Sequence, residues 1–508
     1  MSDRNKALLL AFVSGLLSLG MEIVWTRLVS FTHHTVPQSF AYVLFCYLLG
    51  IALGAHLGKK ACNRSRGDAN VLWRVVGQSL IWSAAFDVVA ISFYAAAWMH
   101  PYFDAFYLFV VITLSAAIKG VIFPIVHYIG SLKSDEELGA SISNIYAANV
   151  AGATIGPLFV GFVLMNIATL QQAMLVCALA AIIVWACVSR QATGAKHQIL
   201  AGVTAVVILG ALGVADKHLL IRELVAREDG SSAKIEFINE SRHGTIHAIR
   251  DSDGDLVVHG ENLYDGKINT SLTHDVNGLF RVYALTAMHH NPKRVLVIGL
   301  SGGSWVEVLR HFPGVDSIDV VEINPNYLKL VKSQPEVAPL LDDPRVKIHI
   351  TDGRKYIRQH HEKYDLIVMN TTWHWRAYSA LLLGQDFLSS LRGSLNSGGV
   401  IAFNTTSSMD VFYTAAQVFP FAGLYSNFVF ASDHDIRPQL KQNAARIYQV
   451  AMAVAGPSAN ATAIAEAANR TANREIQLVS EVKFERPPEV VTERNMITEY
   501  KYGMPFIH

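Results

Sequence analysis

The first 215 residues contain seven apolar stretches, and this pattern restricts the folds that this part of the chain can adopt. Crossing a bilayer as a helix takes about 20 apolar residues. The stretches cover residues 7–30, 37–58, 75–98, 103–129, 141–164, 168–188 and 198–215. The first has no small-residue cleavage site of the kind that ends a signal peptide, and further spans follow it. The sequence therefore predicts a transmembrane helical bundle of about seven helices over residues 1–216, in the lipid bilayer of the plasma (inner) membrane.

Several ionisable residues lie within these predicted spans: Glu22, Arg27, Asp87, Lys119 and His127. Charge inside hydrocarbon is costly and usually faces a partner or a wet cavity. One interpretation is a polar pocket that admits a substrate head group. The other, which we favour because a soluble domain follows, is buried pairing of Asp87 with Lys119 that fixes how the helices dock.

A small-residue face in the fifth span also predicts close helix packing. Gly152 and Gly156 are four residues apart on one side of that helix, and Gly161 follows. Small residues let two helix backbones approach closely. The contact is either within one chain or between two chains of a homodimer.

After Asp216 the composition changes to that of a soluble domain. Short β-prone runs at residues 234–239, 245–250 and 256–258 are separated by turn signals and predict a small antiparallel β-sheet within residues 217–275. A helix is predicted over residues 275–289. Five apolar runs then alternate with helical segments, at residues 295–298, 317–321, 346–350, 366–369 and 400–404. This α/β alternation predicts a Rossmann-like, doubly wound, methyltransferase-type sheet over residues 276–435, with a helical segment and tail over 436–508.

A glycine-rich loop directly follows the first strand of this predicted sheet. Gly299, Gly302 and Gly303 would let the backbone approach a ligand closely, and Glu322 ends the next strand, where a carboxylate can accept both ribose hydroxyls. A tight strand-to-helix turn is the simpler alternative. No phosphate-binding lysine follows, which favours a nucleoside over a nucleotide. Because ligands bind at the carboxyl ends of parallel strands, the candidates there are Ser301, Glu322, Asp352 and Asn370.

Charge and cysteine content narrow the possible functions further. A formal net charge of +1 gives no basis for nucleic-acid binding. The four cysteines are confined to the predicted membrane half, at Cys46, Cys62, Cys177 and Cys187. Their spacing predicts neither a disulfide framework nor a zinc site, and we expect no metal.

Four motifs in the soluble half resemble those of a known family. RVLVIGLSGG, VVEINP, DDPRVKIHITDGRKYI and YDLIVMN look like the successive motifs of spermidine synthases, the polyamine aminopropyltransferases. The similarity is to their membrane-anchored, multi-span branch, and covers roughly residues 235–404. Residues 22–27, EIVWTR, are similar to the first helix of that branch.

The resemblance implies roles for several residues at the nucleoside site. Glu322 would hold the ribose, and Asp352, with Gly353 beside it, would hold the adenine amino group. Asn269, in the segment YDGKIN, stands where the family has a glutamine that contacts the nucleoside. Gly299, Ser301 and Gly303 would form the substrate loop, and no cofactor is implied beyond S-adenosylmethionine or its decarboxylated form as the substrate.

The amine half of the family pattern is missing. Gly302 stands where the family has an aspartate that holds the amine of decarboxylated S-adenosylmethionine, and Asn370 stands where an aspartate deprotonates the attacking amine. The tyrosine and glutamate that help to bind the polyamine are also replaced, near Gly278 and Phe280. An ammonium in a pocket needs an anionic partner. These losses argue against a diamine acceptor, unless another acid such as Asp275 or Glu261 holds the amine.

Directly after Asn370, the segment Trp373-His374-Trp375-Arg376, followed by Tyr378, replaces the family sequence. Arg376 could receive a carboxylate, His374 could add a hydrogen bond or act as a base, and Trp373 could stack on a sulfonium. The alternative is an aromatic lid or a membrane-facing belt in which Arg376 meets lipid headgroups.

These observations favour an enzyme that binds a nucleoside sulfonium and breaks its bond on the aminopropyl side, releasing 5′-methylthioadenosine. The fragment would go to an unknown acceptor or, in a lyase-like reaction, to its own carboxylate to give homoserine lactone. The catalytic candidates are Asn370, His374, Arg376 and Asp275. Alternatives are a polyamine aminopropyltransferase proper, a methyltransferase, and a transporter or sensor with a catalytically dead domain.

Basic residues predict the membrane topology, and the prediction contains a conflict. The second loop holds Lys59, Lys60, Arg64, Arg66 and Arg74, and the sixth holds Arg190 and Lys196. By the positive-inside rule the N-terminus is cytosolic, so seven crossings would place the soluble domain outside the cytosol. A nucleoside sulfonium substrate favours the cytosol instead. A re-entrant seventh stretch, leaving six crossings, would remove the conflict.

Overall fold

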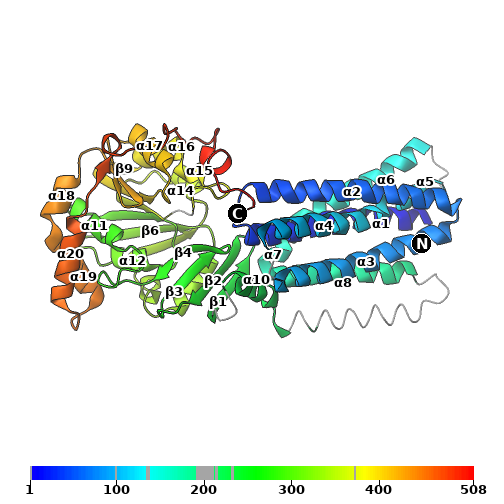
Figure 1. Cartoon of the computed structure of the whole chain (residues 1–508), viewed down its shortest axis with the longest axis horizontal. Coiled ribbons are helices and arrows are strands. Elements are labelled where there is room, and N and C mark those ends of the chain that lie inside the picture. Colours follow the sequence, from blue (N-terminus) through cyan, green and yellow to red (C-terminus); the bar gives the residue numbers. More distant parts are fainter. Residues whose placement is uncertain are drawn as a thin grey trace. The chain divides into compact units, whose positions relative to one another are not determined.

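The computed structural model describes residues 3–97, 100–132, 138–189, 211, 215–229, 234–370 and 373–507. The chain forms two compact units. The first comprises Met1–Ala233, Glu240–Arg242 and Pro505–His508, and the second comprises Lys234–Asn239 and His243–Met504. The first is helical and the second holds a mixed α/β sheet, as Figure 1 shows by colour along the chain.

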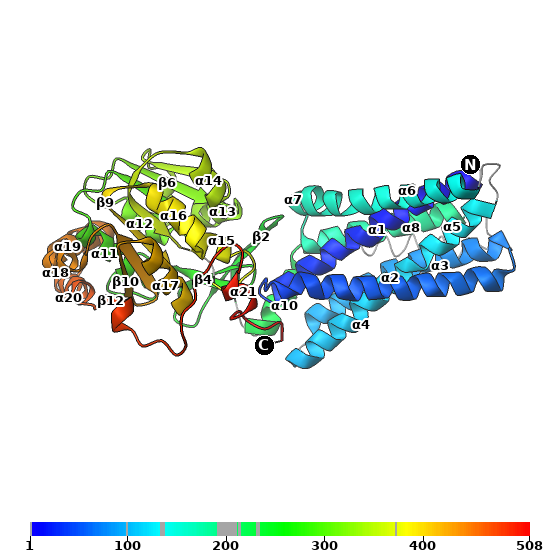
Figure 2. The same cartoon turned by 90° about the horizontal axis from the view of Figure 1, so that it is seen from above.

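Long helices dominate the first unit, and they lie side by side in both views (Figures 1 and 2). Among the described residues, six helical segments are long and apolar enough to cross a membrane. The main helices are α1 (Asp3–Thr32), α2 (Gln38–Ser65), α3 (Ala69–Ala96), α4 (Pro101–Gly120), α5 (Ile122–Leu132), α6 (Leu138–Leu158) and α8 (Leu170–Ser189). Helices α4 and α5 together form one span, Pro101–Ser131. The predicted seventh span, residues 198–215, lies almost wholly outside the described residues.

The second loop is shorter than the apolar pattern predicts. Helix α2 continues to Ser65, so Lys59, Lys60 and Arg64 lie on its last turns rather than in a loop. Lysine and arginine are good helix formers and extend the helix beyond its apolar segment. Asp68 then caps α3 by accepting a hydrogen bond from Asn70 N at 2.8 Å.

The glycines of α6 pack against α1 of the same chain. A Cβ atom added at Gly152 would lie 1.8 Å from Phe12 O, and one added at Gly156 would lie 2.4 Å from Leu16 O. No larger side chain fits at either position without displacing the α1 backbone. The predicted close contact is therefore confirmed, and it lies within one chain.

The buried charges of α3 and α4 pair as predicted. Lys119 Nζ lies 2.6 Å from Asp87 Oδ2, and both side chains are buried. Ser115 Oγ donates to Asp87 Oδ1 at 2.6 Å, and Trp25 Nε1 donates to Ser115 Oγ at 3.3 Å. The pair thus belongs to a polar network that joins α1, α3 and α4.

An eight-stranded sheet forms the centre of the second unit. Its order is β12-β10-β11-β9-β8-β5-β6-β7. The five strands from β9 to β7 run parallel, and β11, β10 and β12 add an antiparallel edge. The strands are β5 (Arg294–Ile298), β6 (Ser317–Glu322), β7 (Val346–Ile350), β8 (Tyr364–Met369), β9 (Leu395–Asn404), β10 (Phe421–Tyr425), β11 (Phe428–Ser432) and β12 (Gln477–Leu478). The predicted α/β class with a parallel sheet is confirmed.

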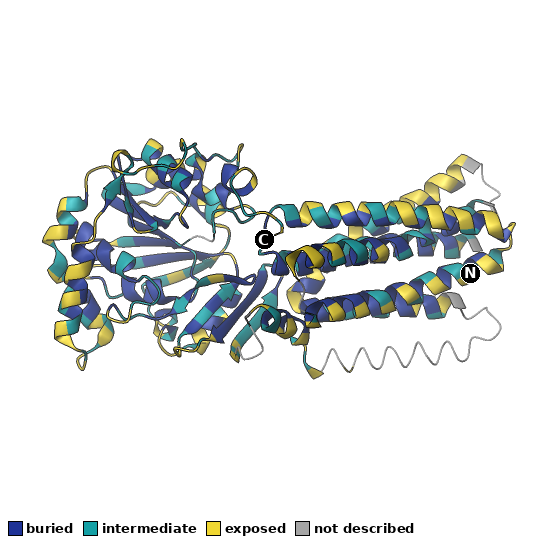
Figure 3. Ribbon diagram, in the orientation of Figure 1, coloured by how far each residue is buried: buried dark blue, intermediate teal, exposed yellow. Residues whose placement is uncertain are grey.

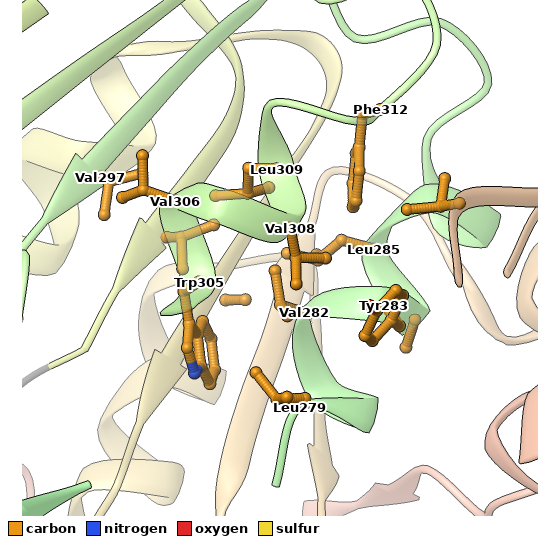
Figure 4. Packing of buried hydrophobic residues seen from close by; sticks show 14 of the residues in the cluster. Leu279, Val282, Tyr283, Leu285, Val297, Trp305, Val306, Val308, Leu309 and Phe312 are labelled. Carbon is orange, nitrogen blue, oxygen red and sulfur yellow. The ribbon is translucent and has the colours of Figure 1, made fainter. Parts of the chain in front are cut away.

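Helices cover both faces of this sheet. Successive strand residues point to opposite sides, and both sets are apolar, so each face has a hydrophobic surface that a helix layer can bury. Val295 and Val297 pack on one side with α11 (Phe280–Met288), α12 (Ser304–Leu309) and the C-terminal helices. Figure 4 shows Val297 in this cluster with Val282, Leu285, Trp305 and Val308. Leu296 and Ile298 pack on the other side with α14 (Gly353–Gln359), α15 (Ala380–Leu383), α16 (Gln385–Gly393) and α17 (Met409–Val418). Strands β5, β6 and β8 are accordingly buried along almost their whole length, whereas β7 at the edge of the sheet is partly exposed (Figure 3).

A second, four-stranded antiparallel sheet precedes the large one, with the order β1-β2-β3-β4. Its strands are β1 (Lys234–Ser241), β2 (Gly244–Arg250), β3 (Leu256–Gly260) and β4 (Leu263–Ile268). The sequence predicted the first three of these strands but missed β4, whose Asp, Gly and Lys residues are unfavourable in strands. The predicted helix over 275–289 begins only at Phe280.

Candidate functional site

The glycine-rich loop lies where β5 and β8 end side by side. Gly299 has φ +93° and donates its N–H to Val321 O at 2.9 Å. A Cβ atom at this position would lie 2.6 Å from Asn370 O, so only glycine fits between the two strand ends. Ser301 also has a positive φ, +49°, and its hydroxyl donates to Asp265 O at 3.0 Å. The loop is therefore tied to β4 as well as to β5.

Glu322, at the end of β6, binds this loop directly. Its Oε2 accepts a hydrogen bond from Leu300 N at 2.8 Å, and its Oε1 accepts one from Asn324 N at 2.7 Å. The side chain is 4% exposed, and burial raises its pKa to about 7. Each carboxylate oxygen can accept a second hydrogen bond, which a ribose hydroxyl could donate. The carboxylate is thus oriented by the protein before any ligand binds.

A second carboxylate, which is half-buried and is not among the predicted site residues, lies beside this loop. Asp265 on β4 accepts a hydrogen bond from the Tyr327 hydroxyl at 2.6 Å. Burial raises its pKa, while the nearby positive charge of Arg376 lowers it. Gly260 makes room for the contact, since a Cβ atom there would lie 2.5 Å from the Tyr327 hydroxyl oxygen. In the sequence, only the acidic character of Asp265 could have indicated a site residue, and it lies in β4, a strand that was not predicted.

Asp352 and Gly353 follow β7 at the start of α14. Asp352 is exposed and caps this helix, since its Oδ1 accepts a hydrogen bond from Lys355 N at 2.8 Å. A Cβ atom at Gly353 would lie 3.0 Å from Ile298 Cγ2, so glycine allows α14 to begin against the end of β5. Asp352 thus already caps α14 through Oδ1, and the expected contact with the adenine amino group would be a second role for the same carboxylate.

A pocket at the strand ends brings together part of the predicted set. It is lined by Lys267, Asn277, Val297, residues 299–305, Val368 and Asn370. Gly299, Ser301, Gly303 and Asn370 thus meet in one place, as predicted from their positions after β5 and β8. Asn269 lies next to this pocket, because its N–H donates to Ser304 Oγ at 3.1 Å. The lining does not include the other predicted site residues, which are Asp275, Glu322, Asp352, Gly353, Trp373, His374 and Arg376, although Glu322 binds the lining residue Leu300.

Asp275, one of the acidic candidates, is bound to the start of α11. Its Oδ1 accepts a hydrogen bond from Leu279 N at 2.5 Å, and its Oδ2 accepts one from Phe280 N at 3.2 Å. Both oxygens therefore satisfy backbone donors that the first turn of a helix otherwise leaves unpaired. This capping gives the residue a structural role, and its catalytic role stays a prediction.

The segment after Asn370 is held by the loop that follows β9. His374 Nδ1 lies 3.1 Å from Thr406 O and 2.9 Å from Thr406 Oγ1, whose hydroxyl also reaches Thr405 O at 2.8 Å. In the tautomer with hydrogen on Nδ1, which the carbonyl favours, Nε2 is the acceptor nitrogen of the neutral ring. Burial lowers the pKa of His374 and favours that neutral form. The Trp373 and Trp375 rings stack with centroids 6.0 Å apart. The positive charge of Arg376 lowers the pKa of Asp265.

No metal site accompanies these residues. Within the ranges that the structure describes, no group of three or more histidine, cysteine, aspartate or glutamate side chains is arranged to hold a metal ion.

Comparison with known proteins identifies the domain that holds this site. Residues 283–418 match the family model of the spermine/spermidine synthase domain. A polyamine aminopropyltransferase of Thermoanaerobacter sp. (strain X514) is 36% identical over 121 residues, which are 23% of this chain and 43% of that protein. One from Clostridium kluyveri (strain ATCC 8527) is 30% identical over 146 residues, or 27% of this chain and 52% of that protein. The chain thus spans about half or less of the length of these relatives.

Solved structures show similarity at lower identity. A spermidine synthase in complex with the transition-state analogue AdoDATO is 18% identical, with a TM-score of 0.37, over 41% of this chain and 76% of that chain. Spermidine synthase from Thermotoga maritima has a TM-score of 0.36 at 18% identity, over 41% of this chain and 75% of that chain. The family match and the curated relatives confirm the predicted resemblance: the C-terminal region carries a spermine/spermidine synthase domain.

Proposed function

We propose that this chain is a membrane-bound enzyme that binds S-adenosylmethionine, or its decarboxylated form, and releases 5′-methylthioadenosine from it. The observation that carries the proposal is the position of Glu322. Its buried carboxylate is fixed by Leu300 N and Asn324 N at the edge of the glycine loop, where it can accept ribose hydroxyls. The synthase domain that surrounds it supports aminopropyl-type chemistry.

The reaction needs positioning more than a strong base. A nucleophile attacks the carbon next to the sulfonium on the aminopropyl side, the carbon–sulfur bond breaks, and sulfur keeps both electrons to become a neutral thioether. If the nucleophile is the substrate's own carboxylate, no proton has to be removed. If it is an external amine or hydroxyl, His374 Nε2 is the candidate acceptor for the proton, since its Nδ1 is held by Thr406.

The proposed location is the plasma (inner) membrane. It is supported by six apolar helices of membrane-spanning length among the described residues. Six crossings would return the chain to the side of the N-terminus, and the basic residues near the end of α2 favour the cytosol for that side. A cytosolic synthase domain would also meet its nucleoside sulfonium substrate directly.

Product analysis tests the proposal. Detergent-purified protein is incubated with S-adenosylmethionine or with its decarboxylated form, with and without putrescine, and the released nucleoside is identified. We expect 5′-methylthioadenosine from the unmodified chain, loss of product in Glu322→Gln, and no change in the control Glu362→Gln, whose side chain is exposed. Release of S-adenosylhomocysteine would support a methyltransferase instead, and nucleoside binding without any product would support a sensor.

A further inference from the structure

The start of α11 places a guanidinium where the family binds an amine. Gly278 has φ +61°, and a Cβ atom there would lie 2.1 Å from Arg281 Nη2. Arg281 therefore fills the space that any side chain at residue 278 would need. Position 278 is close to where the resemblance places a tyrosine that helps to bind the polyamine, which is a cation. In this chain the guanidinium of Arg281, itself a cation, lies there instead.

The protein around Arg281 leaves its charge without a bonded anion. Its three hydrogen bonds go to neutral oxygens: Nε to Gly278 O at 2.7 Å, Nη1 to Asn427 Oδ1 at 2.5 Å, and Nη2 to Asn277 O at 2.9 Å. Its Cζ lies 4.5 Å from the centre of the Phe428 ring. Burial lowers the pKa of Arg281 to about 10, so it stays protonated at neutral pH. Of its five N–H donors, three are used, which leaves one on each terminal nitrogen.

This guanidinium adjoins the pocket at the strand ends. Asn277, whose carbonyl it binds, and Trp305, whose ring centre is 5.6 Å from its Cζ, both line that pocket. The other cation there is Lys267, and its ammonium is neutralised by Asp251 at 2.6 Å and Asp255 at 3.0 Å. Among the described residues, Asp275 attracts the charge of Arg281 without bonding to it, and both of its carboxylate oxygens accept hydrogen bonds from the start of α11 instead.

We propose that Arg281 is a specificity-determining residue that selects a substrate tail bearing a carboxylate. This inference rests on the proposed function and deepens it, because it chooses S-adenosylmethionine over the decarboxylated form. A carboxylate on the tail would bring two acceptor oxygens toward the remaining N–H donors on the terminal nitrogens, and the planar fork suits a two-point contact. Arg376, the candidate from the sequence, already acts on the carboxyl group of Asp265.

Binding measurements on the full chain in detergent test this assignment. Calorimetric titrations compare S-adenosylmethionine, its decarboxylated form and 5′-methylthioadenosine. The unmodified protein should prefer S-adenosylmethionine by about tenfold or more, the scale of one hydrogen bond to a charged group. Arg281→Met should remove that preference and leave 5′-methylthioadenosine affinity unchanged, while Arg281→Lys should keep part of it. Arg474→Met is the matched control. Arg474 is exposed, and its Cζ lies 4.1 Å from the centre of the Phe280 ring, so this variant also removes a nearby guanidinium but not the one over Gly278.

Two outcomes would overturn the assignment. One is equal affinity of the unmodified protein for both sulfonium compounds, a result that needs no variant to fold. The other is a preference that survives in Arg281→Met but disappears in Arg376→Met, which would return the role to the residue that the sequence suggested. Failure of the proposed function has a different signature, since it would show as the absence of 5′-methylthioadenosine among the products whatever the binding preference.

Discussion

Raising the pH through the pKa of Glu322 should strengthen nucleoside binding. Burial raises this pKa to about 7, so about one carboxyl group in eleven is ionised at pH 6 and about ten in eleven at pH 8. Ribose hydroxyls donate hydrogen bonds, and they therefore favour the ionised carboxylate, which only accepts. If only that form binds, the affinity for 5′-methylthioadenosine should rise about tenfold between pH 6 and pH 8 and level off above.

Isothermal titration across this pH range measures the effect directly. Glu322→Gln should bind 5′-methylthioadenosine more weakly and lose the pH dependence. An unchanged melting curve of this variant would show that the weaker binding is not caused by unfolding. The pKa of Asp265 is also raised by burial, so Asp265→Asn separates its contribution from that of Glu322. A flat profile in the unmodified protein, or a slope that persists in Glu322→Gln, would refute the assignment of the ribose to Glu322.

Three further predictions concern other parts of the chain. Removing Asp87 or Lys119 alone should cost about 3–5 kcal/mol of stability in detergent, and replacing both by apolar residues should cost less; additive losses in melting curves would contradict the pairing. Asp352→Ala should weaken nucleoside binding by roughly 1–3 kcal/mol in a titration. Asp352→Asn keeps the helix cap, so its binding loss measures the part that comes from the contact with the ligand. Gly302→Asp should lower the melting temperature, and an unchanged melting curve would show that the loop accepts the side chain.

The positions of the candidate nucleoside-site residues could be predicted from the sequence because each residue lies at or just after the end of a strand; their role stays a prediction. A parallel sheet brings the carboxyl ends of its strands to one edge, whatever the lengths of the helices between them. Gly299 and Asn370 therefore line one pocket although they are far apart in the chain, and Glu322 binds the loop between them through Leu300 N. The same logic predicted the strands themselves, since each is a short apolar run that needs two covered faces.

The contacts that complete the site could not be predicted in this way, because they join residues of different sheets and loops. Asp265 meets Tyr327 across 62 positions, in a strand whose Asp, Gly and Lys residues gave no β signal. The hydrogen bonds by which Asp275 caps α11 were also not predicted, because they depend on the exact residue at which the helix begins. Arg281 was overlooked, since nothing in the sequence says that its side chain folds back over Gly278.

The structure also shows why the amine pocket of the family cannot be recovered at residue 302 alone. A Cβ atom at Gly302 would lie 2.9 Å from Ile268 Cγ1 and 3.5 Å from Val258 Cγ2, so a carboxylate there would meet the apolar side chains of β3 and β4. Asn370 is neutral, and Arg281 adds a positive charge beside the pocket. At an effective dielectric constant of about 20, two unit charges at a separation on the order of 7 Å interact by about 2 kcal/mol, which corresponds to more than tenfold in affinity. We therefore expect Arg281 to disfavour a cationic tail, and an aspartate at residue 370 would have to act against it.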